Sequence, residues 1–325
     1  MAGAMARGMR ARLGAAIETR PWVWSFAAAF LVWIAIAASV AGHGALATLS
    51  VALQFATFYA VVGIGQMLVI AAGPGNIDLS IPGVMTVAGY LAIGLMNGAN
   101  AGLVPGLLVG LGVGLSAGIF NIVLIDPLRI PPMIGTLASG FVFQSVAIAY
   151  SRHSHAKPAP MLVSFVSDRV LGVPLIAIVF IAVTIFTAFL LRRSIFGRSV
   201  LAIGQNRTAA RLAGLRIRAT LALVYLASGV LAALAGVLLA TYSGGAALDM
   251  GGDYLLMSIA VVVLGGTSIA GGEASPAGLW GAAMLLDLVV TMLNVFRVGA
   301  GFRFVVTGII IIGVLALARG PEARY

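Results

Sequence analysis

The first residues in this chain that could do chemistry lie between two apolar segments. Asn76, Asp78 and Ser80 alternate with apolar residues in the stretch GPGNIDLSIPG, 73–83, so an extended backbone would place all three side chains on one side. A carboxylate beside an amide and a hydroxyl can hydrogen-bond a polyol. The alternative is structural, because Asp78 or Ser80 could cap the helix that follows. Both interpretations stay open from these residues alone.

Further polar side chains lie inside apolar segments, where such a side chain more often forms a hydrogen bond with another helix than with a solute. Gln66, Asn121 and Thr136 are the next candidates for contact with a solute. Asp287 is the most costly of these groups, since it lies midway along an apolar segment without a neighbouring base. It either bonds another helix or lines a pathway.

A second motif is VLGGTSIAGGEASP, 263–276, in which two glycine pairs surround small hydroxyl residues. The motif lacks the lysine of a phosphate-binding loop. Its small residues either pack closely between helices or form a gate in a pathway. The residues that carry these two hypotheses are Gly265, Gly266, Thr267, Gly271 and Gly272.

Signatures of an enzyme are absent from the sequence. It contains no HExxH and no ATP-binding motif, and its one GxSxG string, Gly114–Gly118, lies inside the apolar segment 102–124. With no cysteine, the chain cannot form disulfides, Cys-ligated zinc sites or iron–sulfur clusters, and three histidines leave little scope for a metal site. We therefore expect no metal and no cofactor bound by this chain.

The elements that must position these residues follow from the composition. Of 325 residues, 61% are apolar and only 9% are charged, whereas a soluble domain carries about 25% charged residues. This excludes an ordinary soluble enzyme and a disordered chain. A membrane-spanning helix needs roughly 20 apolar residues, so we expect an all-α, polytopic membrane protein with about ten spans. The predicted spans are 22–41, 47–72, 79–97, 102–124, 133–150, 174–191, 219–241, 255–270, 277–295 and 304–318.

Two of these predicted spans, 79–97 and 255–270, begin beside glycine-rich breaks and could be half-helices or re-entrant segments. The chain also shows a possible internal repeat at an offset of 171 residues, which places Asp249 over Asp78. That offset corresponds to five spans, so the two halves would have opposite orientations, as in a 5+5 inverted repeat.

The net charge of +10 is explained by topology rather than by nucleic acid. With a cytoplasmic N-terminus, fourteen basic residues fall on the cytoplasmic side and five outside, in agreement with the positive-inside rule. We expect a cytoplasmic tail at 1–21, one transmembrane domain at 22–318 and a second cytoplasmic tail at 319–325. The loop at 151–173 is expected to be external and exposed.

Seven of the arginines lie in the cytoplasmic loop 192–218. Within it, NRTAARLAG (206–214) predicts a short amphipathic helix stopped by Gly214. Its apolar residues, Ala209, Ala210, Leu212 and Ala213, could dock in a partner's groove while Arg207 and Arg211 meet acidic residues. The alternative is a solvated, charged loop.

Five segments in order resemble the permease subunits of ribose-type bacterial ABC importers, which are related to branched-chain amino-acid permeases. The resemblance runs from Phe58 to Ala318, with Pro82 and Glu273 among its departures from the family pattern. The five segments are NIDLSIPGVMTVAGYLA (76–92), RIPPMIGTLAS (129–139), FGRSVLAIGQNRTAARLAGL (196–215), LVYLASGVLAALAGVLLA (223–240) and AVVVLGGTSIAGG (260–272).

The resemblance implies a translocation pathway for a monosaccharide, pentose or hexose, or a similar polyol, in the bacterial inner membrane. ATP would be hydrolysed by a separate cytoplasmic ABC ATPase subunit. The other implied partners are a periplasmic sugar-binding protein and a second permease subunit, in a homodimer or a heterodimer with a paralogue. The helix at 206–214 would be the coupling helix, with Thr208 in place of the family's glutamate; its residues are Arg207, Thr208, Ala209, Ala210, Arg211 and Gly214.

Three alternatives remain at this stage. One is a nucleoside or branched-chain amino-acid permease from the wider family. Another is an ion-coupled secondary transporter, in which Asp78, Asp249 and Asp287 would be relay groups. The last is an intramembrane enzyme, which the missing catalytic motifs disfavour.

Overall fold

The computed structural model describes residues 22–39, 44–151 and 156–299, together with 301–302, 305–306, 308–309 and 312–313. In this part of the chain, seven helices are long and apolar enough to cross a membrane, and two apolar helices are shorter. The prediction of an all-α, polytopic membrane protein is confirmed. The tenth predicted span, 304–318, lies largely outside the described residues.

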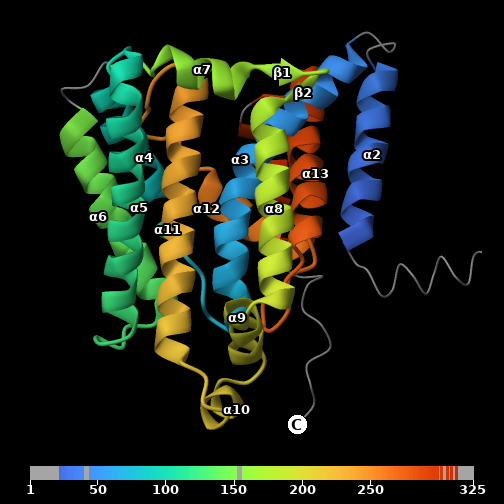
Figure 1. Ribbon diagram of the computed structural model, residues 1–325. Helices are drawn as coiled ribbons and strands as arrows, with labels where there is room; N and C mark the ends of the chain where they lie inside the picture. Colours follow the sequence, from blue (N-terminus) through green and yellow to red (C-terminus); the bar gives the residue numbers. More distant parts are fainter. Residues whose placement is uncertain are drawn as a thin grey trace, which may run out of the picture.

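The long helices stand side by side, with α4 and α12 among them (Figure 1). The long helices are α2 (Trp22–Ser39), α3 (Ala45–Ala71), α5 (Leu103–Ile125), α6 (Pro132–Ser151), α8 (Leu175–Arg193), α11 (Ile217–Tyr242) and α13 (Pro276–Val295). The shorter apolar helices are α4 (Ile81–Met96) and α12 (Tyr254–Leu264), and a 3-10 turn, η1 (Asn100–Gly102), precedes α5.

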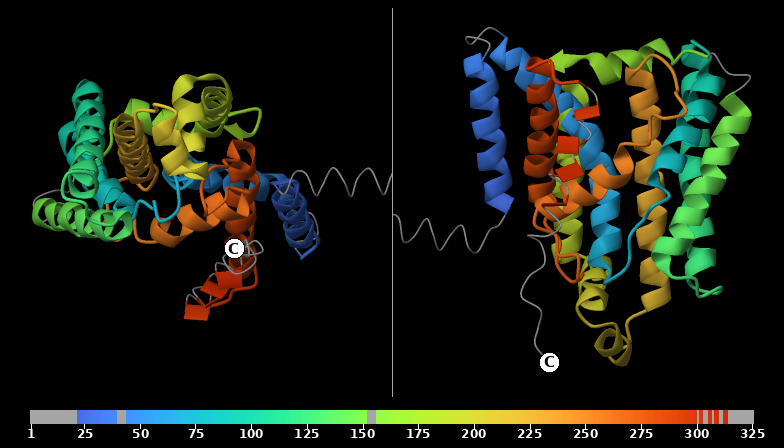
Figure 2. Two further views of the ribbon diagram at one scale, coloured as in Figure 1. Left: turned by 90° about the horizontal axis from the view of Figure 1, so that it is seen from below. Right: turned by 180° about the vertical axis from the view of Figure 1, so that it is seen from behind.

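The centre of the bundle is formed by α3 and α11. From Phe58 to Ala71, almost every residue of α3 is buried, and α11 packs against α3, α4 and α5. Helices that are apolar on all sides are stable only inside a protein or a membrane. By contrast, α2 lies at the edge, where it packs mainly along α13 (Figure 2).

Two of the helices begin after non-helical segments of the chain. Residues 73–80 lead into α4 and residues 243–253 lead into α12. With 11 residues, α12 is about 16 Å long, which is too short for a hydrocarbon core of about 30 Å. The full span predicted at 255–270 is therefore wrong, and its half-helix alternative is confirmed, because the helix ends at Leu264 before the first glycine pair.

The inverted repeat matches the observed helices in three pairs. The C-terminal end of α3 lies at the α10 end of the bundle and that of α11 at the α7 end, so the two helices run antiparallel (Figure 1). Shifting α3, α4 and α5 by 171 residues gives 216–242, 252–267 and 274–296, against Ile217–Tyr242, Tyr254–Leu264 and Pro276–Val295 for α11, α12 and α13. The fourth pair would involve residues outside the described ranges.

One end of the bundle is covered by a segment predicted as an exposed loop. Residues 160–174 form α7 (Pro160–Ser167) and an antiparallel pair, β1 (Arg169–Val170) and β2 (Val173–Pro174). Leu162 and Val166, four residues apart on one face of α7, are buried. Gln54 Nε2 of α3 donates to Val166 O at 3.1 Å. The expectation of an exposed loop is therefore wrong for α7, since its apolar face packs on the bundle.

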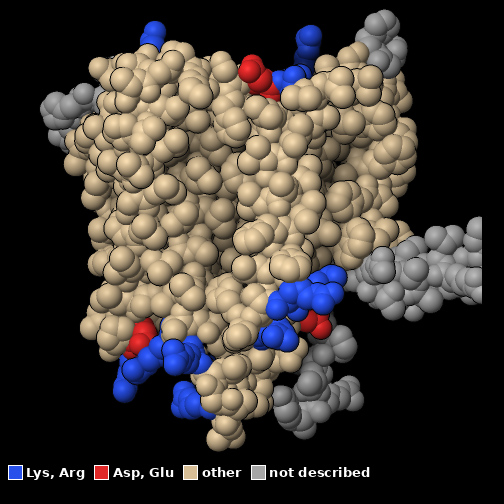
Figure 3. Space-filling model, viewed as in Figure 1, with Lys and Arg blue, Asp and Glu red and all other residues tan. Residues whose placement is uncertain are grey.

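The opposite end carries two short helices, α9 (Ile195–Gln205) and α10 (Arg207–Leu212). Most of the visible Lys and Arg side chains gather around this end, and few lie at the α7 end (Figure 3). The loop residues that supply this charge include the seven arginines between 192 and 218. This asymmetry is the one expected if the α10 end is cytoplasmic.

Candidate functional site

The break between α3 and α4 brings the predicted polar residues into one buried network. Asp78 Oδ1 accepts from Ser80 N at 3.0 Å and from Ser80 Oγ at 2.5 Å. Asp78 Oδ2 accepts from Ser228 Oγ of α11 at 2.7 Å. Asn121 Nδ2 of α5 donates to Ser80 Oγ at 2.9 Å and lies 3.5 Å from Asp78 Oδ1. Three separate parts of the chain thus meet at one carboxylate.

Side chains from neighbouring helices also satisfy the backbone of the break. Gln66 Oε1 of α3 accepts from Asp78 N at 3.2 Å. Thr136 Oγ1 of α6 accepts from Leu79 N and donates to Ile77 O, both at 3.0 Å. Non-helical backbone at membrane depth needs such partners, because the hydrocarbon offers none. These contacts explain how an extended segment is tolerated within the bundle.

Five of the six predicted pathway residues are closed off from the surface in this conformation. Gln66, Asp78, Ser80, Asn121 and Thr136 are all at most 1% exposed. Their contacts show a structural role, and their contact with a solute stays a prediction. The capping alternative is wrong for Ser80, which makes no side-chain cap to α4. Its hydroxyl donates to Asp78 and accepts from Asn121 Nδ2.

The sixth residue, Asn76, lies at the edge of the network. Its Oδ1 accepts from Tyr225 OH at 3.3 Å, and it lines a cavity of about 910 Å³. The cavity is at the α10 end and has one ion pair, Arg218 Nε to Asp126 Oδ2 at 3.2 Å. The arginines that line it are Arg129, Arg207, Arg211, Arg216 and Arg218.

Two network residues were not among the predicted site residues. Tyr225 and Ser228 of α11 are fully buried and contact Asn76 and Asp78. A signal for them exists in the sequence, because polar residues three apart in an apolar helix lie on one face. That spacing alone does not identify the partner, which is 150 residues away in the chain.

Two atoms of the network have no hydrogen-bond partner among the described residues: Gln66 Nε2 and Asn121 Oδ1. A buried polar atom left unpaired costs about 1–3 kcal/mol. The network therefore holds one spare donor and one spare acceptor beside Asp78.

Close helix packing holds the network together at Gly65. A Cβ added there would lie 2.9 Å from Ser228 Cα, so we expect Gly65→Ala to push α11 and its Ser228 hydroxyl away from Asp78. Overpacking of this kind destabilises by about 1–3 kcal/mol, which thermal unfolding in detergent can measure. The matched control is Gly112→Ala on α5, where a Cβ meets no atom within 4 Å. Equal unfolding temperatures for the two variants would contradict the close approach.

The predicted docking helix is present as α10. Asn206 Oδ1 caps it by accepting from Ala209 N at 2.9 Å, and Gly214 follows with a φ of 77°, a conformation that favours glycine. The helix prediction is confirmed. Two apolar residues of α10 differ in exposure, however, because Ala210 is 4% exposed and Leu212, its last residue, is 84% exposed. Leu212, and not Ala210, is therefore available to a partner.

The glycine-pair loop packs against two segments of the α10 end. Gly272 N donates to Ala71 O at the end of α3 at 2.9 Å, and Gln205 Nε2 donates to Gly272 O at 3.4 Å. A Cβ on Gly271 would lie 2.6 Å from Gly73 Cα. These contacts support the packing interpretation and connect the last residue of α9, next to α10, with the start of the break.

The other members of this loop pack on the start of α13. A Cβ on Gly265 would lie 2.8 Å from the carbonyl carbon of Gly278. Gly266 has a φ of 90°, and Thr267 Oγ1 accepts from Ser275 N at 3.1 Å. The role of the loop as a gate stays a prediction.

Asp287 of α13 is 7% exposed, and its Oδ2 has no partner among the described residues. Both hypotheses for this residue, an interhelical bond and a pathway lining, remain predictions.

These features together define a class. An apolar bundle with broken helices, a buried polar network at one break and an exposed short helix at the charged end is the arrangement of a multi-pass membrane transport protein.

The chain belongs to the family described as "Branched-chain amino acid transport system / permease component", whose model matches residues 47–315. It is 32% identical to the ribose import permease protein RbsC of Bacillus subtilis (strain 168), over 81% of each chain. It is also 30% identical to the autoinducer 2 import system permease protein LsrC of Enterobacter sp. (strain 638), over 87% of this chain and 85% of the relative. No solved structure matches. The resemblance to ribose-type permeases is confirmed.

Proposed function

We propose that this chain forms the translocation pathway of an ABC importer for a monosaccharide or a similar polyol. The observation that carries the proposal is the similarity to a ribose import permease over four fifths of both chains. The family match at 47–315 includes the break at 73–80, the glycine-pair loop and α10. A nucleoside or branched-chain amino-acid substrate is not favoured by the relatives that the chain matches.

The proposed mechanism starts at α10. Leu212 and the arginines around it dock on a cytoplasmic ABC ATPase, which hydrolyses the ATP. We expect no ATPase site and no bound cofactor in this chain. Movement of α10 reaches Gly272 through Gln205, and Gly272 is bonded to the end of α3. The break at 73–80 then shifts relative to α5 and α11.

In the open state, the spare donor Gln66 Nε2 and the spare acceptor Asn121 Oδ1 would bond sugar hydroxyls beside Asp78. Such contacts are few, which suits a pathway that must release its solute. A second permease subunit, identical or paralogous, completes the pathway, and a periplasmic sugar-binding protein delivers the solute at the α7 end.

We further propose that the protein lies in the bacterial inner membrane with both termini in the cytoplasm. The basic residues around α9 and α10 support this orientation.

Transport by reconstituted protein tests the proposal. The chain is incorporated into proteoliposomes with its ABC ATPase and its solute-binding protein, and uptake of radiolabelled ribose, xylose and galactose is measured. We expect uptake that requires ATP, the ATPase and the binding protein. Uptake by the chain alone, driven by a proton or sodium gradient, would instead establish an ion-coupled carrier. Uptake of leucine and none of the sugars would overturn the substrate class.

A further inference from the structure

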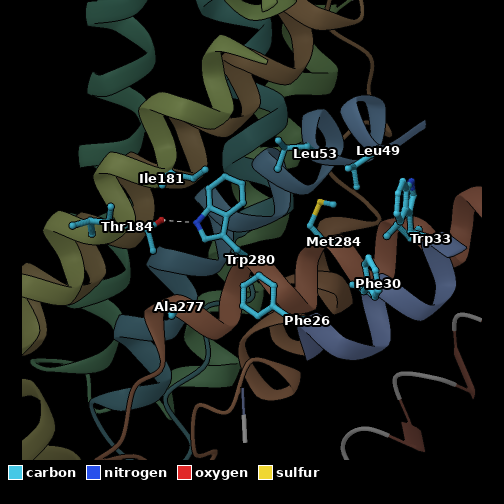
Figure 4. Close-up of a pocket in the computed structure, with 13 residues that line it drawn as sticks. Phe26, Phe30, Trp33, Leu49, Leu53, Ile181, Thr184, Ala277, Trp280 and Met284 are labelled. Carbon is cyan, nitrogen blue, oxygen red and sulfur yellow. Dashed lines mark hydrogen bonds between the residues drawn. The ribbon is translucent and has the colours of Figure 1, made fainter. Parts of the chain in front are cut away.

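A second cavity lies far from the polar network, between α2, α3, α8 and α13. It has a volume of about 550 Å³, and aromatic side chains from α2 and α13 face into it (Figure 4). Its walls include Phe30, Trp33, Leu53, Ile185, Trp280 and Met284.

The walls of this cavity offer no free polar group to a solute. Trp280 Nε1 donates to Thr184 Oγ1 at 2.9 Å, and Trp33 Nε1 donates to Ala45 O at 3.0 Å. The other lining side chains are hydrocarbon or thioether. A sugar would lose its hydrogen bonds with water here and gain none, which costs several kcal/mol. The occupant that fits is therefore an apolar chain.

The cavity opens to the surroundings of the bundle. On its rim, Phe30 is 58% exposed and Ile185 is 65% exposed. Both residues belong to helices long and apolar enough to cross a membrane. The medium at this rim is therefore lipid, and an acyl chain can enter from the side.

A basic pair stands at one end of the cavity. Arg192 and Arg193 are seven and eight residues after Ile185 on α8, which places them on the same face, about 11 Å closer to the α10 end. Both are exposed. Among the described residues, the ion pair that forms is Arg218 with Asp126, so neither arginine forms an ion pair with a described carboxylate. Basic residues at the cytoplasmic surface attract anionic lipids.

We propose that this cavity binds one anionic phospholipid, with an acyl chain against Trp280 and the headgroup at Arg192 and Arg193. The apolar walls favour an acyl chain, and the opening to the bilayer lets that acyl chain enter. The basic pair favours a negatively charged headgroup. The site bridges α2, which lies at the edge of the bundle, to α8 and α13.

Quenching of Trp280 by brominated lipid tests the site, because this side chain lines the cavity and is 7% exposed. Trp22, Trp24 and Trp33 are replaced by Phe in the full chain, which is purified and delipidated in detergent. Dibromostearoyl phosphatidylglycerol or dibromostearoyl phosphatidylcholine is then titrated in. We expect saturable quenching, with half-saturation at a several-fold lower concentration of phosphatidylglycerol.

Two variants test separately the site of the acyl chain and the site of the headgroup. Ala277→Phe places a ring in the cavity and is expected to weaken quenching at least fivefold, whereas Ala149→Phe, at an exposed position on α6, leaves it unchanged. The double change Arg192→Gln and Arg193→Gln removes the preference for phosphatidylglycerol. Elution volume and circular dichroism establish that each variant is folded.

Three results would overturn the proposal. They are absence of saturable quenching, equal half-saturation by the two lipids, and unchanged quenching in folded Ala277→Phe. The first is also the result expected if another part of the chain or a second copy fills the cavity.

Discussion

Asp78→Ala is expected to abolish uptake and to lower the free energy of unfolding by about 3 kcal/mol or more. The change removes the carboxylate that accepts from Ser80 N, Ser80 Oγ and Ser228 Oγ. Each buried donor left without a partner costs about 1–3 kcal/mol. Thermal unfolding in detergent measures the loss of stability, and proteoliposome uptake measures the loss of transport.

The inverted repeat supplies the control for this variant. Asp249 is the counterpart of Asp78 at the 171-residue offset, but it is exposed. Asp249→Ala should therefore change stability by no more than about 0.5 kcal/mol. If the two variants unfold at the same temperature, the buried network does not stabilise the break.

Leu212→Glu is expected to abolish ATP-driven uptake while the protein remains folded in the membrane. Leu212 is 84% exposed on α10, so a charge there costs the isolated chain little, but it would be buried against the ATPase. Loss of a central docking residue typically costs 2 kcal/mol or more, which is about a 30-fold loss of affinity. Retention of the ATPase on the immobilised permease measures this loss.

Two further variants at α10 sharpen the experiment. Leu212→Met keeps an apolar side chain and should keep most of the uptake and the ATPase binding. Ala210→Asp is a poor probe of docking, because Ala210 is 4% exposed and the change would disturb the packing of α10 itself. Normal uptake by Leu212→Glu would exclude α10 as the docking element.

The sequence predicted the helices best where the length of an apolar segment and the positions of the glycines beside it indicate the same element. Hydropathy places nine of the predicted spans on described helices, and the glycine-rich breaks identify the two short ones, α4 and α12. The boundary of α12 was wrong because the predicted span was carried through the glycine pair to residue 270, whereas α12 ends at Leu264 and the backbone turns at Gly266 with a φ of 90°. Apolar composition alone does not report that turn.

Short helices outside the bundle were the least predictable elements. α7 has eight residues and α9 has eleven, and each packs a buried face against the bundle. α9 also has an N-cap, Ser194, whose Oγ accepts from Gly197 N at 2.9 Å. Isolated helices of this length are marginal. α10 was predictable because its limits are marked by a capping residue, Asn206, and by Gly214.

The polar site was predictable in its members but not in its geometry. The alternation of Asn76, Asp78 and Ser80 indicated an extended segment, and Asn121 and Thr136 contact that segment. Contact of these residues with a solute stays a prediction. Ser228 was missed, because one serine in an apolar helix gives no sign of a partner 150 residues away. The sequence also could not tell that Asp78 is fully enclosed.

The length of α12 has a consequence for how the protein is made. A segment of 11 residues cannot leave the protein-conducting channel and settle in lipid as a separate span, since that takes roughly 20 apolar residues. The chain before it, 243–253, is not helical and would expose unpaired backbone groups to hydrocarbon. α12 can therefore enter the bilayer only by packing against helices that cross it, and the two that it packs on most are α3 and α13. A chain truncated before Pro276 lacks one of these two partners, so we expect it to be held at the insertion machinery or degraded.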